Sequence, residues 1–388
     1  MMAYRDPAFI KLFFSLLRSG LYGKPLTDEE LPESIDWEGV VALAQRHGVQ
    51  GTIIESVQLL PDRLRPYGQT MARMGKFALG LIHANMILDR TVGKLVAFLR
   101  EHGVDGVLLK GQGVARYYRK PQMRQSGDID FYVGNEVYQK AVDLCNVGLN
   151  VNKKTSYETE QHYVFYTDGV EIELHRLATE RHSHQKGHEL QKWIVEELEG
   201  SAKRRALVLG GTEVALPSYD FDALYIFYHA WHHLITGGIG LRQLCDWAMI
   251  FNYHSDDIDT DKLKDNIHRF GLTRGWKLFA YIAVKYLGVE EDKIPLYDPR
   301  HAKRYERVMK EIVLQGNFGT FSKSGVKKDG YRLSDEIEKF RCITEYSLAL
   351  FPIIPAEAVT IYFKRAFSGI GSHIARTLRR PGKNHHKS

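Results

Sequence analysis

The spacing of apolar residues in the first hundred positions predicts helices. Between Asp36 and Gly48, apolar side chains recur at helical intervals. They are Trp37, Val40, Val41, Leu43 and Ala44. Aspartate is a favourable residue at a helix N-cap. A longer helix is predicted from Tyr67 to Arg100, after Pro66. We interpret residues 1–100 as an N-terminal helical region that contributes packing rather than chemistry.

Beyond residue 100 the apolar runs become shorter and are separated by turns. Alternation of side chains and turn residues predicts a strand, a helix, a strand, a helix and a hairpin, at Val104–Leu109, Val114–Tyr118, Asp128–Val133, Glu136–Val147 and His162–Leu174. The hairpin has a tight turn at Asp168–Gly169. Residues 101–180 are therefore expected to form a small α/β core.

The helical pattern returns from about Leu190. It predicts four successive helices, at Asp222–Ile235, Leu241–Tyr253, Asp261–Phe270 and Arg274–Leu287. The polar segment Lys323–Gly330 is predicted to be a loop. We assign residues 181–345 to a C-terminal helical domain and residues 346–388 to a basic C-terminal helix and tail.

The net charge of +6 on 388 residues is concentrated at the end of the chain. After Glu357 there is no acidic residue, whereas seven basic residues lie between Lys364 and Lys387. Without them the chain is nearly neutral, which argues against a general nucleic-acid-binding surface. The basic tail is either a solvated terminus or a contact with an anionic membrane surface or RNA.

Cysteine usage and hydropathy predict a cytoplasmic protein, with the tail as a possible peripheral membrane contact. Cys145, Cys245 and Cys342 are far apart and form no CxxC pair, so neither a disulfide framework nor a zinc ribbon is expected. No run of about 18 apolar residues predicts a transmembrane segment. The N-terminus does not have the pattern of a signal peptide.

Candidate chemistry begins with two carboxylates on one predicted strand. Asp128 and Asp130 are two positions apart, so their side chains point to the same side. Such carboxylates repel one another unless a cation lies between them. Mg²⁺ takes a few carboxylates together with phosphate oxygens, and two such ions about 3.5–4 Å apart can hold the attacking and leaving oxygens of a phosphoryl transfer.

The residues around the first turn are candidates for binding a triphosphate. Gly111 and Gly113 lie where a strand is predicted to turn into a helix, which lets backbone N–H groups approach phosphate. Lys110 and Arg124 add positive charge, and Gln112 and Gly127 complete the candidate nucleotide-binding set. In the hairpin, Glu171, Glu173 and His175 alternate on one face. Glu173 is the candidate for the third metal ligand, or for the base that activates the acceptor.

A second polar cluster is predicted in the helical domain. His229 and His233 share a helix face, and so do Arg242 and Asp246, because each pair is four residues apart. These residues and His175 either line the cleft opposite the carboxylates or form a buried polar network. Arg242 and Asp246 are expected to pair structurally, and a zinc site is the weaker alternative.

Together these motifs resemble the uncharacterised bacterial nucleotidyltransferase family within the polymerase β superfamily. The resemblance is carried by "LLKGQGVARYYRKPQMRQSGDIDFYV" from Leu108, "VEIELHRL" from Val170 and "YHAWHHLITGGIGLRQLCDWAMI" from Tyr228. Lys110-Gly111 followed by Gln112 departs from the usual Gly-Ser or Gly-Gly pair. The resemblance implies an α+β fold, with a small mixed β-sheet core flanked by N-terminal and C-terminal helical domains.

The leading hypothesis is a metal-dependent enzyme that moves an NMP from an NTP to an unknown acceptor and releases pyrophosphate. Asp128, Asp130 and Glu173 would bind two Mg²⁺ ions, and Lys110, Gly111 and Arg124 would hold the triphosphate. One alternative is a regulatory module that binds nucleotide without turnover. Another is a scaffold that binds a membrane surface or RNA through its basic tail.

Overall fold

The structure is a computed structural model, and it describes residues 6–179, 185–200, 204–236, 238–316 and 333–355, together with 358, 359 and 362. The basic segment Lys364–Lys387 and the predicted loop Lys323–Gly330 lie outside the described residues. Within the part that is described, no helix is long and apolar enough to cross a membrane.

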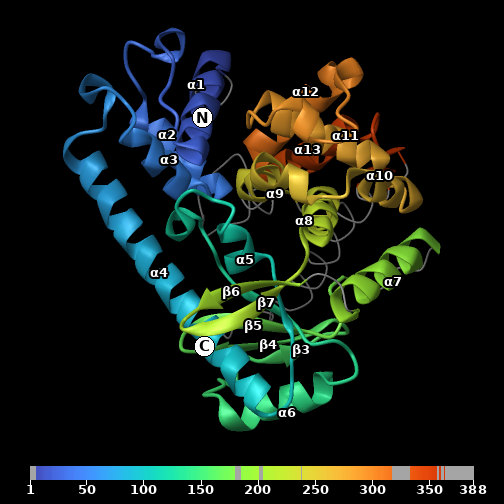
Figure 1. The fold of residues 1–388 in the computed structure, drawn as a ribbon. Coiled ribbons are helices and arrows are strands. Elements are labelled where there is room, and N and C mark those ends of the chain that lie inside the picture. Colours follow the sequence, from blue (N-terminus) through green and yellow to red (C-terminus); the bar gives the residue numbers. More distant parts are fainter. Residues whose placement is uncertain are drawn as a thin grey trace, which may run out of the picture.

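Helices make up the first hundred residues, as predicted. They are α1 (Pro7–Tyr22), α2 (Trp37–His47), α3 (Gln50–Val57) and α4 (Gly68–Glu101). The Asp36 carboxylate accepts a hydrogen bond of 3.0 Å from the Gly39 N–H and so caps α2, and Gly48 ends this helix with φ 66°. Figure 1 shows α4 running from the N-terminal helices to the sheet, so this one helix joins the two parts.

A five-stranded mixed sheet follows, which confirms the predicted fold class. Its strands are ordered β1-β2-β5-β4-β3, with bounds Val107–Leu109, Ile129–Tyr132, Val170–His175, His162–Thr167 and Tyr157–Glu158. Only the β2–β5 pair is parallel. The predicted turn between β4 and β5 is confirmed, because Asp168 and Gly169 both have positive φ, at 51° and 78°.

Two short helices complete the α/β segment. Helix α5 (Gly111–Ala115) follows β1 directly, three residues earlier than the sequence predicts, and α6 (Tyr138–Gly148) follows β2. Helices α4 and α6 cover one face of the sheet with an apolar cluster that includes Ile129, Phe131, Ile172 and Leu174. Because successive strand residues point to opposite faces, the polar residues between these four lie on the other face.

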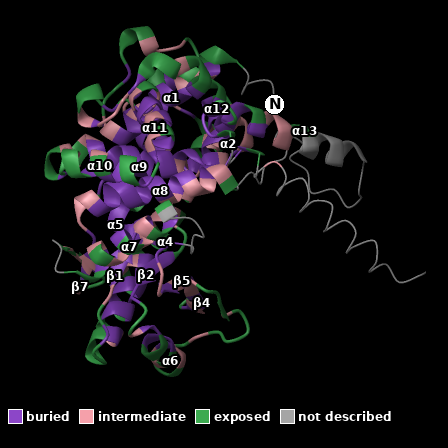
Figure 2. Cartoon of the chain, turned by 90° about the vertical axis from the view of Figure 1, so that its right-hand side faces the viewer, coloured by how far each residue is buried: buried purple, intermediate pink, exposed green. Residues whose placement is uncertain are grey.

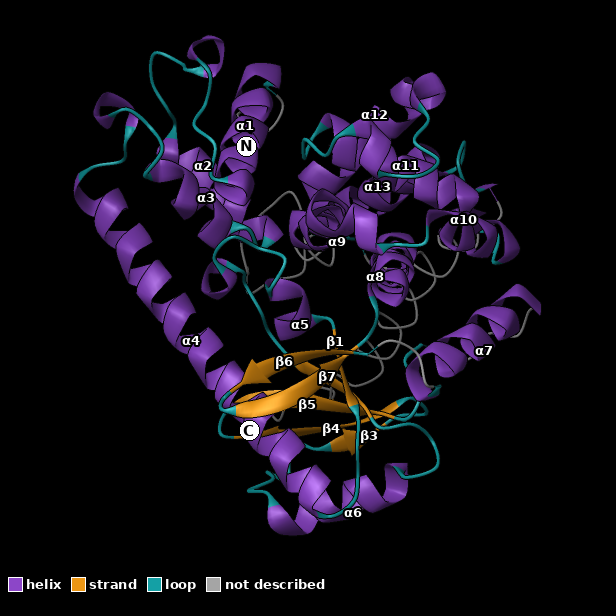
Figure 3. Cartoon of the chain, viewed as in Figure 1, coloured by secondary structure: helices purple, strands orange, loops and turns teal. Residues whose placement is uncertain are grey.

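The predicted C-terminal helices are present. The helices after the sheet are α7 (Gln185–Glu199), α8 (Tyr219–Thr236), α9 (Leu241–His254), α10 (Thr260–Arg269), α11 (Thr273–Lys285), α12 (Ala302–Gln315) and α13 (Leu333–Leu350). Figure 2 shows buried residues running through the centre of this helical part, and Figure 3 shows the strands gathered at one end of the molecule.

Within the predicted C-terminal helical domain, residues 205–216, for which no element was predicted, are not helical. They form a second hairpin, β6 (Arg205–Leu209) and β7 (Thr212–Leu216), joined at Gly210–Gly211. Strand β7 packs against β1 and α4. The approach to α4 is close, because a Cβ atom on Gly93 would lie 2.5 Å from the Leu209 carbonyl oxygen. The hairpin thereby belongs to the sheet core although it follows α7 in sequence.

His47 connects three helical segments. Its ring lies 3.2 Å from the Val313 carbonyl through Nε2, and its Nδ1 accepts a hydrogen bond of 3.3 Å from the Leu241 N–H. The ring is fully buried and sits at the end of α2, against α9 and α12. Burial lowers the pKa of His47 to about 4, because desolvation disfavours the charged ring.

This depressed pKa predicts a loss of stability in mild acid. The ordinary pKa is 6.5, so between pH 6.5 and about 4 the unfolded chain binds a proton that the folded chain excludes. The contribution is intact above pH 6.5 and falls by on the order of 3 kcal/mol as the pH drops through this window. We expect urea unfolding at stepped pH to show this slope reduced in His47→Gln, which keeps a donor and an acceptor but does not titrate. Parallel pH profiles for the two proteins would contradict the assignment.

Candidate active site

The sheet brings the three predicted carboxylates together. In the parallel β2–β5 pair, Asp130 lies opposite Glu173, and Asp128 immediately precedes β2. One oxygen from each of the three carboxylates lies within 4.8 Å of the others. The apolar neighbours of these residues are held against α4 and α6, and this packing turns the acidic side chains toward α8 and α9.

Charge within this carboxylate group is uneven. Asp130 is buried, and its Oδ1 lies 2.9 Å from the Lys110 ammonium. Burial alone would raise the pKa of Asp130, but Lys110 and a hydrogen bond from His175 keep it far below the ordinary value. The charge on Asp130 raises the pKa of Asp128. The group therefore holds more negative charge than Lys110 neutralises, and an additional cation would stabilise it.

Lys110 occupies this position through an unusual backbone conformation. Its φ is 51°, a region that residues other than glycine rarely adopt, and Gly111 follows with φ 42°. Such a conformation costs about 1–3 kcal/mol and persists where the surrounding structure enforces it. The ammonium contacts Asp130 and lies 3.4 Å from Nε2 of His229. The sequence predicted that Lys110 binds a triphosphate, whereas in the folded chain its ammonium contacts the Asp130 carboxylate.

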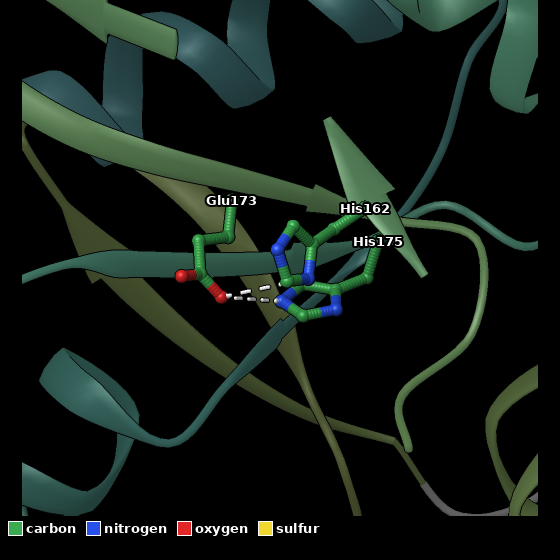
Figure 4. Close-up of side chains that lie close together, drawn as sticks. All are labelled: His162, Glu173 and His175. Atoms are coloured by element: carbon green, nitrogen blue, oxygen red, sulfur yellow. Dashed lines mark ion pairs between the residues drawn. The ribbon is translucent and has the colours of Figure 1, made fainter. Parts of the chain in front are cut away.

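Two histidines border the carboxylates, and only His175 was predicted from the sequence. The Nε2 atom of His175 lies 3.1 Å from Asp130 and 3.2 Å from Glu173. Burial would lower the pKa of His175, but hydrogen bonds to these two carboxylates raise it to about 9. His162 was missed, although it pairs with His175 across the predicted hairpin, and its Nδ1 lies 3.8 Å from Glu173. Figure 4 shows both rings turned toward Glu173.

The opposite wall of the site comes from α8 and α9. His229 and His233 share a helix face as predicted, with their Nε2 atoms 3.0 Å apart. Burial, and then the charge of Lys110, lower the pKa of His229 well below its usual value and that of His233 to about 4. Both rings are therefore neutral near pH 7. Among the residues that the structure describes, the groups with metal-ligand spacing lie on the sheet, which gives no support to the alternative of a zinc site on α8.

The predicted pairing of Asp246 with Arg242 is wrong. Asp246 instead makes a two-pronged ion pair with Arg124, with both nitrogen–oxygen distances 2.7 Å, and it accepts a third hydrogen bond from the Tyr118 hydroxyl. Both charged side chains are buried. Arg124 also donates to the Ser126 hydroxyl. With these bonds the guanidinium links the segment before β2 to α9. Arg124 therefore lines the site, but it is not available to bind a triphosphate, which was the predicted role.

Among the described residues that line the cavity wall, Arg242 is a cation without a carboxylate partner. Its Nη1 donates a hydrogen bond of 2.8 Å to the Gln125 carbonyl, and no carboxylate among the described residues forms an ion pair with it. Its Nε is buried without a hydrogen-bond partner in the described part of the chain. Burial and the charge of Arg124 lower the pKa of Arg242 from its ordinary value. The wall therefore presents a positive charge that lacks a full set of partners.

These residues enclose a cavity of about 420 Å³. It is lined by the candidate residues Lys110, Gly111, Arg124, Gly127, Asp128, Asp130, Glu173, His175, His229, His233, Arg242 and Asp246. Gln112 is the exception among the candidates. Its side chain is buried on the other side of α5 and donates to Asp89 of α4. The cavity is also lined by His162, Gln161 and Gln243, which were not predicted from the sequence.

The geometry agrees with the comparison against known families. A family model described as uncharacterised nucleotidyltransferase matches residues 33–288, which include the sheet, the carboxylates and the opposing helices α8 and α9. The chain belongs to this uncharacterised nucleotidyltransferase family.

Other comparisons add little to the family assignment. No curated protein matches the chain. Among solved structures, an antigenic nucleotidyltransferase-like protein from Paracoccidioides brasiliensis matches with 12% sequence identity and a TM-score of 0.31. That match covers 48% of this chain and 88% of the other. The family indicates a nucleotidyltransferase, and the roles of individual residues are argued from the cavity.

Proposed function

We propose that the protein is a metal-dependent nucleotidyltransferase that moves an NMP from an NTP to an acceptor and releases pyrophosphate. The observation that carries this proposal is the convergence of Asp128, Asp130 and Glu173, with their oxygens within 4.8 Å, on the wall of a cavity. An acceptor oxygen would form a bond to the α-phosphorus while the bond to the pyrophosphate oxygen breaks. The chain's own part is to position the reactants and balance their charge.

The donor set fits Mg²⁺. Three carboxylates provide oxygen ligands, which this ion prefers, and the raised pKa of Asp128 reports the repulsion from Asp130 that a cation would relieve. Asp128, Asp130 and Glu173 would hold one or two ions. Bound there, Mg²⁺ would neutralise charge on the phosphates and favour departure of pyrophosphate.

Arg242 is assigned to the phosphates on the opposite wall. Its guanidinium lines the cavity and has a buried nitrogen without a partner among the described residues, whereas Arg124 is neutralised by Asp246. Arginine binds phosphate oxygens through two parallel hydrogen bonds. This replaces the expectation that Lys110 and Arg124 hold the triphosphate. Gly111 and Gly127 border the same space, and a Cβ atom placed on Gly127 would meet no other group within 4 Å.

Calorimetry with ATP, GTP, CTP and UTP, each with and without Mg²⁺, tests this proposal. We expect at least one nucleotide to bind in a Mg²⁺-dependent manner. We expect Arg242→Ala to weaken that binding by roughly 10- to 100-fold, since a charged hydrogen bond to phosphate contributes about 1.5–3 kcal/mol. The loss should be smaller for the corresponding nucleoside monophosphate if Arg242 contacts the β- or γ-phosphate.

Arg73→Ala provides the matched control. Arg73 is exposed on α4, pairs with Glu38 and is not among the cavity-lining residues. This variant should bind nucleotide as the wild type does. Equal affinities for Arg242→Ala and wild type would remove Arg242 from the phosphate site. Absence of Mg²⁺-dependent binding of every nucleotide to folded wild-type protein would overturn the proposed function itself.

A further inference from the structure

Two histidines and a glutamate converge beside the oxygen-rich carboxylate group. His162 and His175 are directly paired in the antiparallel β4–β5 register, so their side chains leave the same face of adjacent strands. Glu173 precedes His175 by two positions and shares that face. The ring centroids of the histidines are 4.9 Å apart, and Figure 4 shows both rings directed at the Glu173 carboxylate.

The hydrogen bonds of His175 determine whether Nε2, the ring nitrogen that faces the carboxylates, can bind a metal ion. Its Nδ1 lies 3.2 Å from the Leu177 carbonyl oxygen, which accepts and never donates, so Nδ1 carries a proton. Its Nε2 faces Glu173 and Asp130, 3.2 and 3.1 Å away, and the raised pKa of the ring means that this nitrogen also carries a proton, donated to the two carboxylates. A metal ion bound at this point would take the place of that proton, because a histidine ligand must give up the proton on its coordinating nitrogen. Metal-binding histidines are usually oriented in the same way, with the ring nitrogen that does not bind the metal donating its proton to a carbonyl or carboxylate oxygen.

His162 lacks the partner that a purely structural role would give it. Its Nδ1 is buried and makes no hydrogen bond within the described part of the chain. The atom points at the same Glu173 oxygen that His175 contacts, at 3.8 Å. An orphaned buried nitrogen is costly. A cation shared by the three side chains would satisfy it.

The spacing and the donor types suit a zinc-like ion. Around a tetrahedral ion with bonds of about 2.0–2.1 Å, ligand atoms lie about 3.3 Å apart. The two distances to Glu173 are 3.2 and 3.8 Å, and all three ligand atoms lie within 4.8 Å, so shifts of a few tenths of an ångström to about 1 Å would close the site. Imidazole nitrogen is a ligand for zinc more than for Mg²⁺. Two histidines and one glutamate also leave a coordination position open to substrate oxygen.

We propose that His162, Glu173 and His175 form a nitrogen-rich site for Zn²⁺, adjacent to the oxygen-rich Asp128–Asp130–Glu173 group and sharing Glu173 with it. The inference deepens the proposed function and rests on it for the metal-binding role of Glu173. The two metal groups differ in preference, because the nitrogen-rich group favours Zn²⁺ and the oxygen-rich group favours Mg²⁺. Substrate oxygens entering between them would meet two chemically different metals.

Calorimetric titration of the full, tag-free chain with Zn²⁺, in a large excess of Mg²⁺, tests the site. We expect the wild type to bind Zn²⁺ despite the Mg²⁺. We expect His162→Ala to weaken this binding by at least about tenfold, while Asp128→Asn, which alters only the oxygen-rich group, leaves it within about threefold. His102→Ala serves as the control, because His102 is an exposed histidine at the end of α4. Comparison with it accounts for zinc held by other histidines.

Two outcomes would overturn the proposal. One is equal zinc affinity for wild type and His162→Ala, with both folded by circular dichroism. The other is zinc binding that Asp128→Asn removes and His162→Ala retains, which would place the ion in the oxygen-rich group. If either occurs while Mg²⁺-dependent nucleotide binding persists, the transferase proposal stands and the nitrogen-rich site alone fails.

Discussion

Asp130→Asn is expected to reduce nucleotidyl transfer roughly a thousandfold, equivalent to about 4 kcal/mol of transition-state stabilisation. Asp130 is the buried centre of the site, with Lys110, His175 and Glu173 around it. Asparagine keeps the size of the side chain but removes the charge that would bind the metal. Pyrophosphate release from the nucleotide selected by calorimetry provides the rate.

The fold must be checked alongside that rate, because the substitution also leaves the Lys110 ammonium without its partner. Circular dichroism and thermal melting separate lost chemistry from lost structure. Asp128→Asn provides a second variant, since Asp128 is exposed and should lower the rate without the same structural cost. Asp143→Asn, on the exposed face of α6, should keep the full rate. A folded Asp130→Asn protein with more than about a tenth of the wild-type rate would be incompatible with the proposed role.

Asp246→Ala is expected to lower the free energy of unfolding by about 3–5 kcal/mol, the largest stability effect that we predict for one side chain. It leaves the Arg124 guanidinium and the Tyr118 hydroxyl buried without their acceptor. Because Arg124 precedes β2 and Asp246 is on α9, the change also removes an ion pair that connects the two walls of the cleft. Chemical denaturation measures the loss.

Two further proteins make this measurement specific to the buried pair. Asp261→Ala removes a carboxylate that is 92% exposed and paired with Lys264, and it should change stability by less than about 1 kcal/mol. Replacing both members, as Arg124→Met with Asp246→Leu, should be less damaging than Asp246→Ala alone, because no unpaired charge remains buried. A loss below about 1 kcal/mol in Asp246→Ala would show that water or neighbouring groups compensate Arg124.

Local patterns were sufficient to predict much of the architecture. The N-cap at Asp36, the long helix α4, the hairpin turn at Asp168–Gly169 and the sequence of C-terminal helices all depend on residues close together in the chain. The predicted strand and hairpin also carried the three candidate carboxylates, which the parallel β2–β5 pairing then brings together. These features are encoded by periodicity and by turn residues, which act over a few positions.

Features that depend on distant segments were mispredicted. Asp246 was paired with Arg242, its neighbour on the helix, whereas the fold supplies Arg124 from 122 residues away. Gln112 was placed with the nucleotide, but α5 turns it toward Asp89. The β6–β7 hairpin was missed although Gly210–Gly211 lies between two alternating runs, a signal that a search for hairpins would find. His162 carried a similar signal, since the predicted turn already placed it opposite His175.

The turn at Asp168–Gly169 makes the proposed active site sensitive to the length of the hairpin that carries it. Its two residues fix the β4–β5 register, in which Thr167 lies opposite Val170 and His162 opposite His175. Adding or deleting one residue in β5 between the turn and Glu173 would rotate that carboxylate to the apolar face, because strand side chains alternate. Natural variation in this hairpin should therefore consist of substitutions at its surface positions, with insertions confined to the loops on either side of it. A designer who wished to lengthen the protein here would have to do so in steps that preserve the alternation.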